Sequence, residues 1–245
     1  MGTLTESTIA VDTAGAAAVT TVDLRQSQVR ELNAALHALP PEESPGTWRV
    51  EHPDGKHNLA VGLNDDVTVE ISGHVGYYCA GMNQTATVVV HGNAGVGVAE
   101  NMMSGRVHVQ GNASQSAGAT AHGGLLVIDG DASARCGISM KGVDIVVGGN
   151  VGHMSAFMGQ AGRLVVCGDA GDALGDSIYE ARLYVRGSVQ SLGADCIEKP
   201  VRAEHLAELA DLLGAAGRTE DPAEFRRYGS ARQLYHFKVD NSSAY

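Results

Sequence analysis

A glycine recurs every 19 residues through the middle of the chain. It closes seven short aliphatic runs, and the spacing holds six times in succession without a slip. A fixed period of this length indicates a repeat architecture, in which each unit buries its apolar face only against its neighbours. The glycines of this column are Gly73, Gly92, Gly111, Gly130, Gly149, Gly168 and Gly187.

The residues around each glycine predict the content of one repeat. Aliphatic side chains lie two and four residues before it, as Val88 and Val90 lie before Gly92. Two apolar columns two residues apart are typical of a strand with one buried face. The residue after the glycine is mostly Asn or Asp, such as Asn93, and we interpret it as a turn residue that tolerates a left-handed backbone. Seven positions after the glycine nothing larger than a methyl side chain occurs, so we expect that column to be the most crowded: Ala80, Ala99, Gly118, Gly137, Ala156, Gly175 and Ala194.

When such repeats stack, the same residue type lies at the same position in successive repeats. This arrangement predicts an all-β solenoid, a parallel β-helix of about seven 19-residue rungs. A leucine-rich repeat would need a leucine ladder and a helical return, and a propeller would need about 40 residues per blade. All six prolines lie outside residues 54–199, as expected where each strand N–H pairs with the next rung. Helical patterns flank the repeat on both sides, and we expect these two helices to cap its open ends.

The chain therefore divides into four parts. We predict a disordered N-terminus (1–21), an N-terminal helix with its connector (22–57), the β-helix (58–198), and a C-terminal helix with a tail (199–245). Asp23 is the expected N-cap of the first helix.

The tail is rich in aromatic and basic residues, which are enriched where protein surfaces meet. We predict that it docks on a partner subunit. The alternative is that it folds back over the last rung. The expected interface residues are Phe225, Arg226, Arg227, Tyr228, Tyr235 and Phe237.

Composition and charge exclude several function classes. A net charge of −11 argues against nucleic acid or an anionic membrane as partner. We find no apolar run of about 18 residues and no export signal at the N-terminus. Four cysteines without a CxxC spacing favour a reducing compartment. The sequence thus predicts a cytoplasmic protein.

The candidate chemical groups do not converge. Four histidines of the repeat (His74, His91, His108 and His153) fall in four different columns, and we interpret the four cysteines as packing residues. Asp176 and Asp195 share a column one rung apart and could form an acid/base pair. Solvated or interface carboxylates are the alternative, which we favour because no cluster of basic residues accompanies them. We predict no catalytic, cofactor-binding or metal-binding residue in this chain.

The chain resembles a known family in several motifs: GYYCAGMN (76–83), GVAENMMSGR (97–106), SQSAGATAHGG (114–124), GHMSAFMGQAG (152–162) and FRRYGSARQLYHFKVDN (225–241). These motifs resemble the GXGXG β-helix domain at the C-terminus of the glutamate synthase large subunit. Within that family, the free-standing small subunits of N-methylglutamate synthases, also called methylamine–glutamate N-methyltransferases, are most similar. The resemblance covers about residues 22–245, and it implies a right-handed β-helix.

The resemblance also implies a role. The chain would be a non-catalytic scaffold in a three-chain hetero-oligomer that makes N-methyl-L-glutamate and ammonia from methylamine and L-glutamate. Its partners would be a class II glutamine-amidotransferase-like subunit and a glutamate-synthase-like subunit that carries FMN and an iron–sulfur cluster. Two alternatives stay open at this point. One is a stand-alone β-helix enzyme acting on polysaccharide, and the other is the same scaffold role in a glutamate synthase or a formylmethanofuran dehydrogenase.

Overall fold

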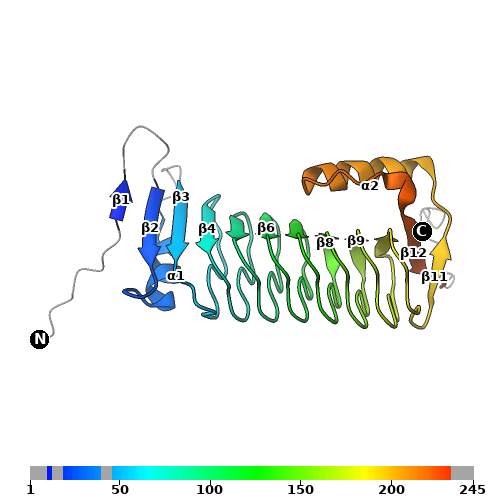
Figure 1. The fold of residues 1–245 in the computed structure, drawn as a ribbon, viewed down its shortest axis with the longest axis horizontal. Coiled ribbons are helices and arrows are strands. Elements are labelled where there is room, and N and C mark those ends of the chain that lie inside the picture. The colour runs from blue at the N-terminus through cyan, green and yellow to red at the C-terminus, as the bar shows by residue number, and fades with distance from the viewer. Residues whose placement is uncertain (1–9, 13–18, 40–45, 233–245) are drawn as a thin grey trace, which may run out of the picture.

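The repeat glycines follow the strands of one long, ladder-like sheet. The structure is a computed structural model that describes residues 10–12, 19–39 and 46–232. Twelve strands lie side by side along a rod, in the order β1-β2-β3-β4-β5-β6-β7-β8-β9-β10-β12-β11 (Figure 1). Their bounds are β1 Ala10–Asp12, β2 Val19–Asp23, β3 Thr47–Glu51, β4 Thr68–Ser72, β5 Thr87–Val90, β6 Arg106–Val109, β7 Leu125–Ile128, β8 Lys141–Val147, β9 Ala161–Val166, β10 Arg182–Val185, β11 Cys196–Lys199 and β12 Arg226–Ser230.

The register of the sheet follows the 19-residue period. From β4 to β10 each strand pairs in parallel with the next, and the partners are 19 residues apart, as in the series Val69, Val88 and Val107. One bulge interrupts this register at the start of β8, where Lys141 pairs with Ala161. A second, shorter ladder of parallel bridges runs two residues after the glycines, for example between Ala94 and Ala113. The predicted parallel β-solenoid of about seven turns is therefore confirmed.

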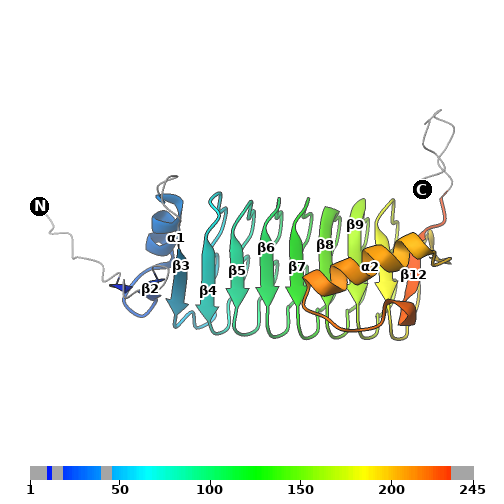
Figure 2. The ribbon, with the colours of Figure 1, turned by 90° about the horizontal axis from the view of Figure 1, so that it is seen from above.

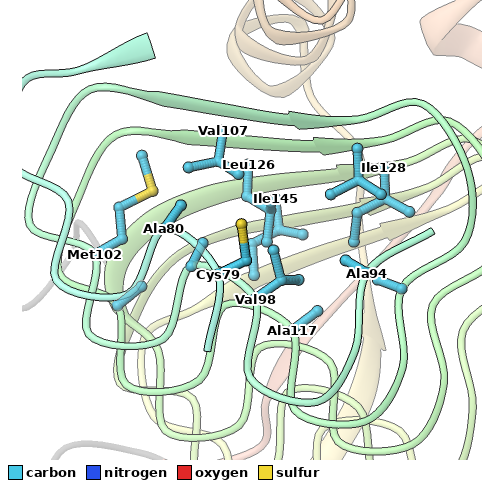
Figure 3. Close-up of a cluster of buried hydrophobic side chains, with 14 of the residues drawn as sticks. Cys79, Ala80, Ala94, Val98, Met102, Val107, Ala117, Leu126, Ile128 and Ile145 are labelled. Carbon is cyan, nitrogen blue, oxygen red and sulfur yellow. The ribbon is translucent and has the colours of Figure 1, made fainter. Parts of the chain in front are cut away.

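The two aliphatic columns form the interior of the rod. Val88 and Val90 are fully buried, as are their equivalents along the sheet. Figure 3 shows the strand residues Val107 and Leu126 pointing toward Val98, which comes from the opposite wall of the solenoid. Because each rung contributes side chains from both walls, one continuous apolar core extends along the rod.

The wall opposite the strands is built from tight turns, and we call it the turn wall (positions 4–11 after each repeat glycine). In each rung from Gly73 to Gly168 three alternating residues adopt a left-handed backbone, as do Tyr78, Ala80 and Met82 with φ of 60°, 54° and 55°. Such a conformation costs a side chain with a Cβ roughly 1 kcal/mol or more. Backbone hydrogen bonds between rungs offset this cost: the N–H of Ala80 donates to Leu59 O at 2.9 Å, and that of Ala99 donates to Cys79 O at 2.9 Å.

The N-terminal region differs from the prediction at two points. β1 and β2 form where the sequence predicted disorder up to residue 21, and β2 pairs in parallel with β3. Asp23 is not a helix N-cap, because it ends β2 and its Oδ1 accepts a hydrogen bond from the N–H of Arg25 at 2.9 Å. The helix α1 (Val29–His37) begins after Gln28 instead.

The helix α1 covers the interior at the N-terminal end of the solenoid. Leu32 and Leu36 are buried in the same cluster as Leu59 and Leu63 of the first rung. The side chain of Asn33 donates to Asn58 O at 2.7 Å and accepts from the N–H of Ala60 at 3.0 Å. The helix thus occupies the place that a further rung would take.

The second helix, α2 (Ala203–Ala215), does not cap an end, which corrects the sequence-based expectation. It runs along the outer face of the sheet over the C-terminal strands (Figure 2). Its Leu209, Leu212 and Leu213 are buried in a second cluster with outward-facing strand residues. Those strand residues belong to the column three positions before the repeat glycine. Polar residues occur in the first half of this column and apolar or aromatic residues fill the second half: Glu70, Val89, His108, Val127, Val146, Val165 and Tyr184.

Candidate interaction surfaces

The repeat glycines serve close stacking rather than ligand binding. The N–H of Gly111 donates to Gly92 O at 3.0 Å in the rung below. A Cβ on Gly111 would lie 2.3 Å from Asn93 Oδ1 and 2.8 Å from Gly92 O, distances that no side chain tolerates. The glycine column is therefore explained by the approach of successive rungs.

The Asn/Asp column has a different reason from the one predicted. None of these residues has a positive φ, so they are not left-handed turn residues. Each side-chain oxygen accepts a hydrogen bond from the backbone N–H of the equivalent residue in the next rung: Asn93 Oδ1 from Asn112 at 2.8 Å, and Asn112 Oδ1 from Asp131 at 2.8 Å. The column forms a polar ladder along one edge of the rod, and the same bonds from Ser188 lower the pKa of Asp169.

The small-residue column is crowded, as predicted, and it has a second constraint. Gly137 has a φ of 68°, and a Cβ there would lie 3.2 Å from Met140 Sδ and 3.3 Å from Ile145 Cδ1. The last member was misassigned, because the final rung is one residue shorter: Leu174 pairs with Leu192, only 18 residues on. The column therefore does not continue to Ala194.

The four cysteines are buried packing residues. Burial raises the pKa of Cys79 and Cys136 to about 12 and contributes most to raising the pKa of Cys167 and Cys196 to about 11. A thiol with such a pKa stays protonated near neutral pH, so it is a poor nucleophile and a poor metal ligand.

His74, His108, Asp176 and Asp195 have different partners and do not converge on one site. His108 Nε2 lies 2.9 Å from Asp129 Oδ2, and His74 Nδ1 accepts from the N–H of Asn93 at 2.9 Å. Asp176 accepts from Ser177 Oγ at 2.8 Å, whereas Asp195 forms an ion pair with Arg232 at 2.9 Å. Since the last rung is shorter, the two aspartates do not share a column. Within residues 10–12, 19–39 and 46–232, no three His, Cys, Asp or Glu side chains gather as a metal site would require.

Only the first part of the predicted docking tail lies within the described residues, and it packs against this chain itself. Phe225 and Tyr228 are only 3% and 2% exposed, inside this chain's own core, so they are not free to anchor a partner. Arg226 and Arg227 lie on β12, which pairs antiparallel with both β10 and β11. This part of the tail thus follows the alternative, folding back over the last rung. Tyr235 and Phe237 lie outside the described residues.

The turn wall carries most of the exposed large apolar side chains. Tyr77, Met82, Val96, Met103 and Met158 are between 38% and 58% exposed. The ring of Tyr77 stacks on His57 with 4.4 Å between centroids, which holds it in place on the surface. Tyr and Met are enriched in protein interfaces. Sequence reasoning missed this set, although these residues recur four, nine and eleven positions after the repeat glycines.

No helix in the described part of the chain is both long and apolar enough to cross a membrane.

The fold and its repeat define a class: a parallel β-solenoid in which the glycine and Asn/Asp columns stack the rungs. One comparison identifies a relative of the chain. It is 61% identical over 225 residues to Protein GlxC of Rhizobium meliloti (strain 1021), a match that covers 91% of this chain and 99% of that protein. The chain therefore belongs to the GlxC family, which fits the resemblance to glutamate-synthase-like GXGXG subunits. No family model matches the chain, and no solved structure does.

Proposed function

We propose that the chain is the scaffold subunit of a glutamate-synthase-like N-methylglutamate synthase. In this complex it would join an amidotransferase-like subunit to a subunit that carries FMN and an iron–sulfur cluster. The complex would convert methylamine and L-glutamate to N-methyl-L-glutamate and ammonia. The proposal places the protein in the cytoplasm, where these soluble substrates are found.

The observation that carries the scaffold role is the turn wall. Its exposed Tyr77, Met82, Val96 and Met103 lie on the rungs of Gly73 and Gly92, where they offer rigid apolar area for a protein partner. The polar columns are occupied in stacking, as the bond between Asn112 and Asp131 illustrates. A rod with an apolar wall is suited to hold other subunits at fixed positions.

A tagged copy of the chain, isolated from the native cell, tests the assembly. We expect two further chains to co-purify, one of them with the absorbance of flavin and iron–sulfur. The assembled material should form N-methylglutamate from methylamine and glutamate. A chain that elutes alone contradicts the proposal, and formation of glutamate from glutamine and 2-oxoglutarate instead would assign the complex to glutamate synthase.

A pair of substitutions tests the surface. The double variant Tyr77→Asp, Met82→Asp should fold but recover at least tenfold less of the partner chains, because it places two charges in the apolar contact. Gln115→Asp is the matched control, since Gln115 is exposed in the same column as Tyr77. Full recovery with the double variant would show that the partners bind elsewhere on the rod.

A further inference from the structure

Among the described residues, the C-terminal end of the sheet is an open edge. β11 is the last strand in the order, and one of its edges pairs with β12. Its other edge faces the end of the rod (Figure 1), and none of the described strands pairs with it. The backbone N–H and C=O groups of such an edge can accept another strand.

Apolar side chains are grouped at this same end. Leu192, Ile197 and Val201 are 37%, 43% and 38% exposed, and they lie within ten residues of one another in the chain. Single exposed apolar side chains are common on protein surfaces and need no explanation. Three of them beside an open strand edge indicate a surface that is covered by another protein segment.

The sequence of β11 is complementary to itself. When two copies of a strand pair antiparallel across a two-fold axis, the sheet continues from one copy into the other. Side chains that lie directly opposite each other then point to the same face of that sheet. Two registers then keep most of β11 paired. One places Glu198 opposite Glu198 of the second copy, and like charges in that position are destabilising.

The other register has no such conflict. It places Ile197 directly opposite Ile197 of the second copy, and Glu198 opposite Cys196 on each side. Asp195 takes no part, because its φ of 62° ends the extended backbone just before β11. Like charges thus oppose each other in one register only, which favours the register that pairs Ile197 with itself.

We propose that the chain forms a two-fold symmetric dimer through β11, in which Ile197 lies on the axis and the two sheets continue into each other. This inference stands independently of the proposed function. β11 is short, carries charges and is followed by Pro200, features that prevent indiscriminate edge pairing. The contact is confined to the rod ends, so we expect a dimer that forms at micromolar rather than nanomolar concentrations.

Light scattering on the full-length chain over a wide concentration range tests the dimer. The mass should rise from 25.4 kDa toward twice that value. Ile197→Glu should hold the mass at that of one chain at every concentration, because it places two carboxylates on the axis. Ala34→Glu is the control, since Ala34 is exposed on α1 at the other end of the rod, and it should dimerise like the parent.

A cysteine at the axis gives a second readout. Directly opposite residues in an antiparallel pair have Cα atoms about 4.5–5.5 Å apart, which is within the range of a disulfide. Ile197→Cys should therefore form a cross-linked dimer under mild oxidation, whereas Ala34→Cys should not. The native cysteines do not interfere, because all four are buried.

Three results would overturn the proposal. The first is a single-chain mass at all concentrations together with no cross-link at position 197. The second is a series of masses above two chains, which indicates head-to-tail pairing. The third is a dimer that appears only after residues 233–245 are removed, which indicates that the chain's own C-terminus covers β11.

Discussion

At the scale of single residues, two physical constraints can act on the same column of the repeat. The sequence shows only their combined result, a restricted choice of residue type. The restriction to glycine and alanine at Gly118, Gly137 and Ala156 was predicted as crowding, and each of these residues also has a positive φ. The prediction for the Asn/Asp column was wrong. Asn and Asp both tolerate a left-handed turn and can bond to the backbone of the next rung, so the residue type does not distinguish the two roles. A pattern reports which side chains fit, and several physical reasons can produce the same choice.

The small-residue column yields the first prediction at this scale. Gly137→Leu should lower the free energy of unfolding by about 3 kcal/mol or more, because it adds bulk beside Met140 and Ile145 and forces a branched side chain into a left-handed backbone. Gly137→Ala should cost less, since Ala80 and Ala156 occupy the same column with a similar φ. Denaturant unfolding measures both values.

A glycine elsewhere in the chain supplies the control. A Cβ on Gly214, near the end of α2, would meet no atom within 4 Å, and its φ is not positive. Gly214→Leu should leave stability unchanged or raise it by up to about 1 kcal/mol, because leucine is the better helix former. If Gly137→Leu unfolds at the same denaturant concentration as Gly214→Leu, the column is not constrained as we infer.

At the scale of elements, the two helices were predicted as helices, but only one was placed where the structure has it. Each helix has an apolar stripe, and the stripe does not say which surface it covers. The missing information was in the strands: Val127, Val146 and Val165 point outward, and an apolar outward column requires a cover. Because we examined only the inward columns, α2 was assigned to the end of the rod.

One carboxylate adds polar contacts to the apolar packing of α2 on the sheet. Glu208 accepts a hydrogen bond from the buried hydroxyl of Tyr184 and forms an ion pair with Arg182 at 2.5 Å. Burial and this carboxylate raise the pKa of Tyr184, so its hydroxyl stays a donor. Glu208→Ala should destabilise the protein by about 1–3 kcal/mol, because it leaves that hydroxyl unpaired.

Thermal unfolding with a matched variant checks this expectation. Asp211→Ala removes an exposed carboxylate from the same helix and should change stability by no more than about 0.5 kcal/mol. Equal effects of the two variants would mean that the interaction of Glu208 with the sheet contributes nothing specific.

At the scale of the whole molecule, the period determined the architecture and left the ends undetermined. A stack of about seven rungs follows from the glycine spacing, since stacking is the only way to bury their apolar faces. Residues 225–230 carry no period, and their aromatic and basic character fits a docking segment as well as a closing strand. Only the pairing of β12 with β10 and β11 distinguishes the two. The partners and the reaction rest on resemblance, because the repeat pattern specifies a fold and not a reaction.

Truncation tests the role of the closing strand. Removing residues 225–245 deletes β12 and the buried side chains of Phe225 and Tyr228, so we expect a loss of at least about 3 kcal/mol and a lower melting temperature by circular dichroism. Removing residues 233–245 alone keeps β12 and should leave the melting temperature nearly unchanged. If the longer truncation melts like the full chain, β12 does not stabilise the last rungs.

The position of α2 gives the rod unequal mechanical properties along its length. In a stack of repeats each rung contacts only its nearest neighbours, so the rungs can unfold one after another from an end. The helix α2 packs on Val127, Val146, Val165 and Tyr184 together, so the four rungs that carry them should unfold as one unit. The rungs before β6 have no such brace among the described residues. Under tension the molecule would therefore yield in its first half while the second half holds.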